Sequence, residues 1–242
     1  MKLALICLGG ASSKLILKEA ESYFKKADYL DIKKIEVRAD SKQVEVLYNG
    51  KPVDDYDCVY IRGSFKYVLL QRALTYAFRD SYIPMEAETF NVGHDKFLTL
   101  MELQKAGVGI PKTYLAGTTE LAKKILEDVH YPIIMKIPTG TQGKGVMTAD
   151  SLASAKSMLD TLEVFKQPYI IQEFIETDAT DVRAIVVGDK VIASMKRKAK
   201  SGELRANIHQ GGTGIPYELS FEAEKTAIKS AKAVKADICG VD

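Results

Sequence analysis

A glycine-rich loop lies at residues 140–145, where Gly140, Gln142, Gly143 and Gly145 fall within six positions. Glycine lets backbone N–H groups approach a ligand closely, as a loop that binds phosphate requires. The loop lacks the Gly-x-x-x-x-Gly-Lys-Ser/Thr pattern of a Walker loop and the third glycine of a dinucleotide fingerprint. Two interpretations therefore remain, which are a plain turn between two strands and a flexible clamp over phosphates.

Lys136 lies just before this loop, inside the run 132–138, which is otherwise apolar. An unpaired ammonium is expensive to bury, so this side chain must either reach solvent or point at an anion. A position on an edge strand would allow the first alternative. Because Lys136 directly precedes the glycine-rich loop, we favour contact with a phosphate.

A third candidate segment follows the apolar residues 169–171 and consists of Gln172, Glu173, Phe174 and Ile175. An adenine ring needs an apolar slot and backbone groups along its edge, and a strand that runs into a bend can supply both. The competing interpretation makes Glu173 a solvated residue at the edge of a sheet.

Charged residues continue along the next predicted strand, where Asp181 and Arg183 are two positions apart and therefore face the same side. They form either part of a site or an exposed ion pair, which would contribute little to stability. The basic run 196–200 is interpreted as a solvated face at the end of a hairpin.

Arg205 and Asn207 are followed closely by two glycines at 211 and 212. A guanidinium and an amide two positions apart suit the binding of developing negative charge in a transition state. This segment is the strongest candidate for a reacting centre in the last third of the chain.

Strands that alternate with helices must position these residues, which predicts an α/β fold built of α+β modules. In the first module we expect strands at 2–8 and 57–62, a hairpin turn at Asn49-Gly50, a helix that ends near 79, and a boundary near residue 90. The second module has a helix at 95–106, strands at 112–115 and 132–138, and helices at 119–128 and 151–162.

The remaining residues predict strands at 169–175, 181–187 and 190–197, with a two-residue hairpin at Gly188-Asp189. A polar, glycine-rich stretch at 202–214 then precedes an amphipathic helix from about 220 to 236. The chain accordingly divides into segments 1–90, 91–168 and 169–242.

Composition excludes several classes of protein. The chain has 242 residues, and 34 Lys+Arg against 32 Asp+Glu give a net charge of +2, so net charge provides no reason to expect binding to nucleic acid or a membrane surface. No apolar run approaches the ~18 residues of a membrane span. The cysteines and histidines are too scattered for a zinc cluster or a disulfide framework, which suits a reducing, cytoplasmic location. They are Cys7, Cys58, Cys239, His94, His130 and His209.

Taken in order, these motifs resemble those of ATP-grasp ligases of the RimK type, the RimK-like α-L-glutamate ligases. The resemblance covers residues 91–242 and is weaker before them. The motifs are Lys96 within 95–99, Lys136 before the glycine-rich loop, Gln172–Ile175, Asp181 with Arg183, the segment from Arg205 to Gly212, and Gly240–Asp242. Each motif alone is weak, and their shared order carries the resemblance.

The resemblance implies an ATP-grasp fold with a pre-ATP-grasp domain at 1–90, a linker helix and lid at 91–168, and a large subdomain at 169–242. By that analogy Lys96, Lys136 and the 140–145 loop contact phosphates, while 172–175 hold the adenine and Asp181 contacts the ribose. Arg183, Arg205 and Asn207 would face the reacting centre, with Arg205 and Asn207 also near the phosphates. Asp242 would bind Mg²⁺ or Mn²⁺.

The chemistry so implied is ATP-dependent formation of an amide from a carboxylate and an amino acid, glutamate in this subfamily. The acceptor carboxylate would belong to a protein tail, a carrier protein or a coenzyme, and Arg62 and Ser64 are candidates to contact it. Relatives often form homo-oligomers. The alternatives are another ATP-grasp branch, of the glutathione synthetase or D-alanine–D-alanine ligase type, and a nucleotide-binding remnant without turnover.

One departure concerns the metal site. In the family a Glu-x-Asn pair follows the Gly-Val-Asp motif and completes the ligands, whereas the sequence in hand reaches Asp242. We therefore expect the large subdomain to be incomplete, as in a fragment of a longer ligase, and the fragment alone to be inactive.

Overall fold

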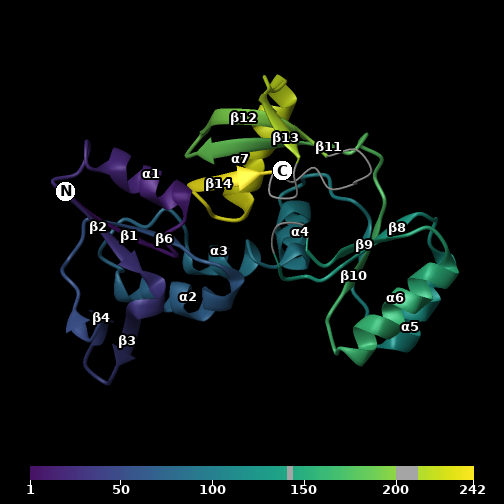
Figure 1. Cartoon of the computed structure of the whole chain (residues 1–242), viewed down its shortest axis with the longest axis horizontal. Coiled ribbons are helices and arrows are strands. Elements are labelled where there is room, and N and C mark those ends of the chain that lie inside the picture. The colour runs from purple at the N-terminus through teal and green to yellow at the C-terminus, as the bar shows by residue number, and fades with distance from the viewer. Residues whose placement is uncertain (141–143, 200–211) are drawn as a thin grey trace. The chain divides into compact units, whose positions relative to one another are not determined.

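The computed structural model describes residues 1–140, 144–199 and 212–242. In it the chain divides into two units, Met1–His94 and Asp95–Asp242, which are described separately (Figure 1). The mixture of helices and sheets in both units confirms the α/β fold class. The further division at residues 90 and 168 stays a prediction.

A parallel sheet with strand order β2-β1-β6 forms the centre of the first unit. Residues 3–7 of its middle strand are all buried, as expected for a strand covered on both faces. Ile6, Val59, Ile61 and Leu74 pack into one core with residues of the neighbouring helices. The elements are β1 (Lys2–Cys7), α1 (Ala11–Ala20), β2 (Lys26–Asp31), η1 (Ile32–Lys34), β6 (Cys58–Arg62), η2 (Phe65–Tyr67), α2 (Val68–Ala77) and α3 (Ala87–Val92).

An antiparallel sheet of the same unit contains β3 (Ile35–Ala39), β4 (Val44–Tyr48) and β5 (Lys51–Pro52). Asn49 and Gly50 connect the last two strands with φ values of 51° and 76°. Positive φ at both positions is the geometry that an Asn-Gly hairpin turn requires, so the turn is confirmed. The strand at 35–39 was not anticipated.

The second unit begins with α4 (Lys96–Lys105) and an antiparallel sheet of order β7-β10-β8-β9. Two helices lie side by side against this sheet (Figure 1), and Leu126, Met135, Leu159 and Ile171 form the centre of their common core. The elements are β7 (Thr113–Tyr114), α5 (Thr119–Asp128), β8 (Ile133–Lys136), β9 (Val146–Ala149), α6 (Leu152–Val164) and β10 (Ile170–Glu173).

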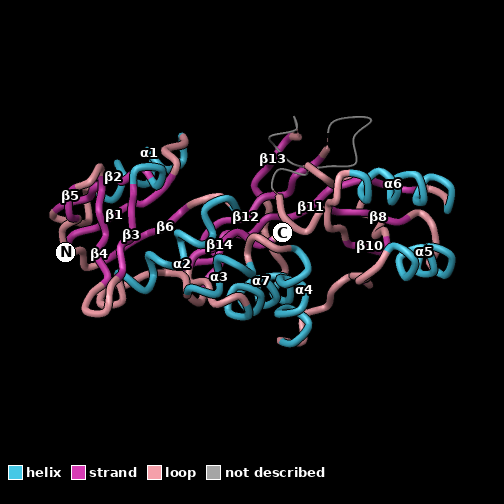
Figure 2. Tube along the Cα trace, turned by 90° about the horizontal axis from the view of Figure 1, so that it is seen from below, coloured by secondary structure: helices cyan, strands magenta, loops and turns pink. Residues whose placement is uncertain are grey.

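A second antiparallel sheet of this unit has the order β13-β12-β11-β14 and is covered by α7, which lies beside α4 (Figure 2). Ala184 and Val186 pack against Ala227 and Ala231 of that helix. Gly188 and Asp189 form the predicted hairpin turn. The elements are β11 (Thr180–Val187), β12 (Lys190–Lys198), β13 (Thr213–Pro216), α7 (Phe221–Ala233) and β14 (Ile238–Val241).

Candidate functional site

Two lysines of the second unit point toward the same region, at the end of β8 and the start of α4. Asp95 caps α4 by accepting hydrogen bonds from the backbone N–H groups of Phe97 and Leu98, at 2.9 and 3.0 Å. The cap fixes Lys96 as the first helical residue. Its Nζ donates to the carbonyl oxygens of Ile137 and Pro138, at 3.0 and 3.2 Å. Lys96 is thereby held against the strand that carries Lys136.

Lys136 lies on β8, which is paired on both sides by β10 and β9. The position is therefore interior, and the edge-strand interpretation of this lysine is wrong. Its Nζ donates to Oε1 of Gln172 at 2.5 Å. The Gln172 side chain is buried, and its Nε2 donates in turn to Oγ1 of Thr113 at 2.7 Å. Thr113 is a contributor that the sequence analysis did not single out.

Both ammonium groups lie where a positive charge is unfavourable. Burial lowers the pKa of Lys136, and the charge of Lys96 lowers it further. Burial also lowers the pKa of Lys96, against a smaller opposing effect of the Asp95 carboxylate. In the described ranges no carboxylate forms an ion pair with either lysine. Two neighbouring cations of this kind have the charge that would suit an anionic ligand.

The glycine-rich loop follows directly. Gly140 and Gly145 have φ values of +126° and +74°, a region that favours glycine. The Gly145 carbonyl accepts from the backbone N–H of Ile137 at 2.9 Å, and the Gly140 carbonyl accepts from Lys96 Nζ at 3.4 Å. The backbone on both sides of 141–143 is thus tied to the lysine site. Gln142 and Gly143 lie outside the described residues.

The predicted adenine segment begins inside β10. Gln172 turns its side chain toward Lys136, whereas Glu173 is exposed and accepts from the backbone N–H of Lys112 at 2.8 Å. Phe174 is half-buried and Ile175 is exposed, just where the strand ends. The backbone at 173–175 therefore leaves the sheet where Glu173 pairs with Ile133, three residues along β8 from Lys136.

Four alternating charges connect β11, β12 and the residue after β14. Arg197 Nε and Nη2 donate to Asp181 at 2.5 and 2.6 Å, and Nη2 also lies 2.9 Å from Asp242 Oδ1. Arg183 donates to the two oxygens of Asp242 at 2.6 and 2.5 Å. Arg183 and Asp181 therefore share a face, as predicted, but each is paired with a different residue.

The interpretation of the basic run 196–200 as a solvated face is wrong for Arg197, because the Arg197 side chain is only 4% exposed. Its hydrogen bonds with Asp181 raise its pKa, and Asp242 contributes in the same direction. Side chains alternate between the two faces of a strand, and this alternation could have suggested that one residue of the run 196–200 points inward. The sequence of the run does not identify which residue does so. Arg205 and Asn207 lie outside the described residues.

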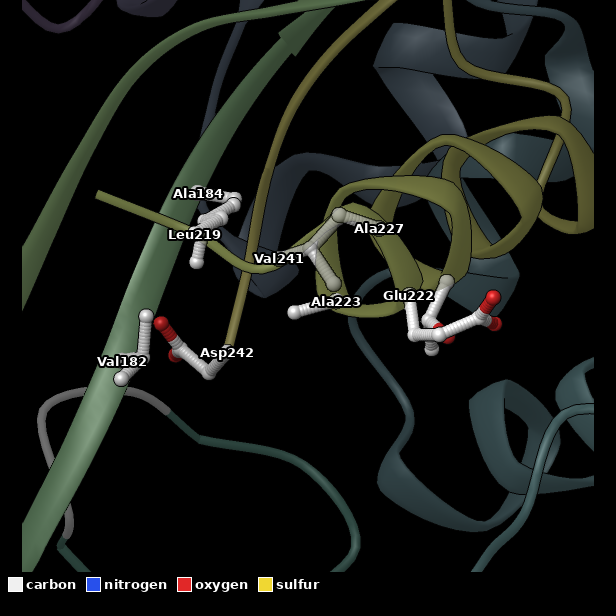
Figure 3. A pocket seen from close by; sticks show the side chains of 9 residues that line it. Val182, Ala184, Leu219, Glu222, Ala223, Ala227, Val241 and Asp242 are labelled. Carbon is white, nitrogen blue, oxygen red and sulfur yellow. The ribbon is translucent and has the colours of Figure 1, made fainter.

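A separate pocket of about 320 Å³ lies between β11, β14 and α7 (Figure 3). Its lining is largely apolar, including Val182, Ala184 and Ala227, and its charged side chains are those of Glu222 and Asp242. The Asp242 carboxylate beside this pocket is already paired with Arg183 and Arg197.

None of the described helices has the length and hydrophobicity required to cross a membrane.

Comparisons with known proteins identify the family of the chain. The RimK-like ATP-grasp domain family matches residues 93–242. A probable α-L-glutamate ligase of Marinomonas sp. is 33% identical over 235 residues, which are 96% of this chain and 78% of that protein. A protein of the same name from Hydrogenovibrio crunogenus is 32% identical over 248 residues, covering 100% of this chain and 82% of its own length.

Solved structures show the same fold. The RimK domain protein ATP-grasp from Sphaerobacter thermophilus superposes with a TM-score of 0.71 at 16% identity, over 100% of this chain and 84% of that one. The ATP-grasp ligase PsnB complexed with a minimal precursor, Mg and ADP gives 0.70 at 15% identity, over 99% and 82%. The chain belongs to the RimK-like ATP-grasp family and is an ATP-dependent ligase.

Proposed function

We propose that this ligase activates a carboxylate as an acyl phosphate with ATP and joins it to the amino group of glutamate. Two sequence relatives of about 33% and 32% identity are named probable α-L-glutamate ligases, and this is the support for glutamate. The acceptor is proposed to be a carboxylate on a protein tail, a carrier protein or a coenzyme. The same proposal places the protein in the cytoplasm as a homo-oligomer.

The single observation that carries the proposal is the lysine pair. Lys96 and Lys136 are half-buried and both have lowered pKa values, and their ammonium groups are held by carbonyl and amide oxygens. Neutral acceptors orient an ammonium without cancelling its charge. The positive charge therefore remains available for a polyphosphate, which is the most strongly charged part of ATP.

The other nucleotide contacts are assigned by position along the same unit. We propose that residues 140–145, with Gly140, Gln142, Gly143 and Gly145, cover the phosphates. The backbone of Glu173, Phe174 and Ile175 would hold the adenine. The Gln172 side chain would hold the Lys136 ammonium in place by accepting its hydrogen bond. Asp181 would accept from the ribose hydroxyls. Its side chain remains 35% exposed beside Arg197, which supports this role.

Two displacements account for the reaction. An acceptor carboxylate oxygen forms a bond to the γ-phosphorus while the bond to the β–γ bridging oxygen breaks, and ADP leaves. The glutamate nitrogen then bonds to the acyl carbon and loses a proton, while the carbon–oxygen bond breaks and phosphate leaves. Neither step needs a covalent protein nucleophile. Lys96, Lys136, Arg183, Arg205 and Asn207 would orient the reactants and stabilise the developing charge.

The ATP-grasp fold implies a divalent metal ion beside ATP. Asp242 is the predicted ligand, yet both of its oxygens accept from arginines. Across 1–140, 144–199 and 212–242 no three carboxylates, cysteines or histidines converge on one point. The described residues thus do not by themselves fit Mg²⁺ or Mn²⁺. Asp242 as a ligand stays a prediction.

Mass spectrometry of a cell extract incubated with the full-length protein, ATP, MgCl₂ and isotopically labelled glutamate tests the proposal. We expect one or more labelled glutamyl units on an acceptor, with stoichiometric release of ADP and phosphate. The matched control is Lys136→Ala, in which the rate of labelling should fall by ~10²-fold or more. Nucleotide binding without any dependence of ATP consumption on an amino acid would contradict the proposal.

A further inference from the structure

Arg197 joins two carboxylates, one on β11 and one directly after β14. It stands directly opposite Asp181 in the pairing of β11 with β12, and both of these residues lie on the face that carries Arg183. On the other face Ala184 and Val186 pack against α7. The guanidinium is therefore on the side of the sheet that faces away from the α7 core.

The guanidinium of Arg197 is itself a poor contact for a nucleotide. The side chain is 4% exposed, and Nε and Nη2 are engaged by the two carboxylates. A planar guanidinium that makes two parallel bonds to a carboxylate fixes the plane as well as the position of that carboxylate. Arg197 thus determines where the oxygens of Asp181 point.

Asp181 keeps acceptor capacity after this pairing. A carboxylate offers about four lone-pair positions, and the bidentate pair uses one on each oxygen. The side chain is 35% exposed, so the remaining positions are open to a donor. Two neighbouring hydroxyl groups, such as the 2′- and 3′-hydroxyls of a ribose, match two carboxylate oxygens held in one plane.

We propose that Arg197 is a positioning residue, which orients Asp181 so that the site distinguishes ribose from deoxyribose nucleotides. The inference rests on the proposed function, because it takes Asp181 as the ribose contact. Arg197 touches no part of the nucleotide. Its effect is confined to interactions with the sugar hydroxyls.

Calorimetric titration of the 242-residue chain with ADP, 2′-deoxyADP and 3′-deoxyADP tests the inference. In the unaltered chain we expect ADP to bind about 10-fold or more tightly than at least one of the deoxynucleotides, the ratio expected for a hydrogen bond to a charged group. In Arg197→Met the ratio should fall to about 1, and affinity for the discriminated deoxynucleotide should change little. Arg197→Lys, which cannot make two parallel bonds, should restore only part of the ratio.

Lys198→Met is the matched control, since Lys198 is an exposed cation on the same strand. It should keep the full ratio. A folded Arg197→Met or Arg197→Lys chain with the unaltered ratio overturns the inference and leaves the proposed function intact. An unaltered chain that does not bind ADP overturns the proposed function instead. One that binds all three nucleotides equally overturns the ribose role of Asp181 and this inference with it.

Discussion

The ammonium of Lys136 and the side-chain amide of Gln172 form one hydrogen bond, in which Nζ lies 2.5 Å from Oε1. The same amide donates to Thr113 Oγ1, and the Thr113 hydroxyl donates to the Pro111 carbonyl at 2.8 Å. Because Oε1 faces a donor and Nε2 faces an acceptor, only one orientation of the amide satisfies both contacts. This relay of hydrogen bonds from Lys136 to Pro111 holds Lys136 in place. Because the acceptor is a neutral amide, the positive charge of Lys136 is not cancelled.

Lys136→Ala should lower turnover by ~10²-fold or more, by analogy with the loss of a preorganised donor to developing charge. The measurement is the initial rate of ADP release with glutamate and a cell extract that contains the acceptor. Lys156→Ala is the matched control, because Lys156 is a half-buried lysine away from this site that pairs with Glu127 at 3.0 Å. Near-normal turnover in the Lys136 variant would contradict the proposed contact of this residue with a phosphate of ATP.

The affinity for ADP should fall as the pH rises, and the fall should begin at a lower pH than the usual pKa of a lysine predicts. Burial lowers the pKa of Lys136 below its usual value of 10.5, so the folded protein loses this charge at a lower pH than the unfolded chain. Phosphate binding favours the protonated form and weakens as that form disappears. Titration calorimetry across the alkaline range measures the fall, and Lys136→Arg should move it to higher pH.

The same shift has a consequence for stability with a definite sign. Because the unfolded state binds more protons than the folded state between the lowered pKa and the ordinary one, stability contributed by Lys136 rises with pH through that window. Lys136→Met should remove this contribution. An unchanged pH dependence of the urea midpoint in Lys136→Met would show that Lys136 titrates normally.

Thr113→Val should destabilise the protein by about 1 kcal/mol, since it removes the acceptor of a buried amide N–H. ADP affinity should also fall, because Gln172 is no longer held in one orientation. Urea unfolding and calorimetry measure the two effects. Thr113→Ser keeps the hydroxyl and should remain close to the unaltered protein. If both variants bind ADP equally well, the relay does not position Lys136.

Asp95→Ala should cost about 1 kcal/mol of stability by removing the cap of α4. Asp95→Asn keeps a side-chain oxygen for the backbone N–H groups of Phe97 and Leu98 and should retain most of that stability. It also removes the carboxylate that opposes the lowered pKa of Lys96. The two variants therefore separate capping, read from the urea midpoint, from charge, read from the pH dependence of ADP binding.

Gly145→Ala should destabilise the protein by about 1–2 kcal/mol, the cost of a left-handed conformation in a residue with a Cβ. An added Cβ would also lie 3.0 Å from Cδ1 of Ile137. Gly117→Ala is the control, because a Cβ at Gly117 would meet no atom within 4 Å. Comparable urea midpoints for the two variants would contradict the constraint at Gly145.

Local sequence signals identified many of the elements that carry the site. The helix at 119–128 has an apolar face and a threonine cap, and the turns at Asn49-Gly50 and Gly188-Asp189 have residues that such turns require. Helix caps and tight turns depend on residues that are close in the sequence, so the sequence alone predicts them. The ordered motifs likewise led to the RimK-like family.

The register of the paired strands could not be predicted from local sequence signals. An unbroken register from the Gly188-Asp189 turn would place Lys196 opposite Asp181. A β-bulge between Ile185 and Val186 shifts the register by one residue, so Arg197 occupies that position. A shift of one residue reverses the face of every side chain beyond it. For this reason the basic run could not reveal its buried member.

The sequence by itself determined the family, the periodic helices and the residue types of a nucleotide site, because these are properties of composition and local spacing. Tertiary structure alone decided that β8 is an interior strand, that Gln172 supports Lys136, and that Arg197 links Asp181 to Asp242. Each of these depends on contacts between residues 10 to 45 positions apart, which no local pattern encodes.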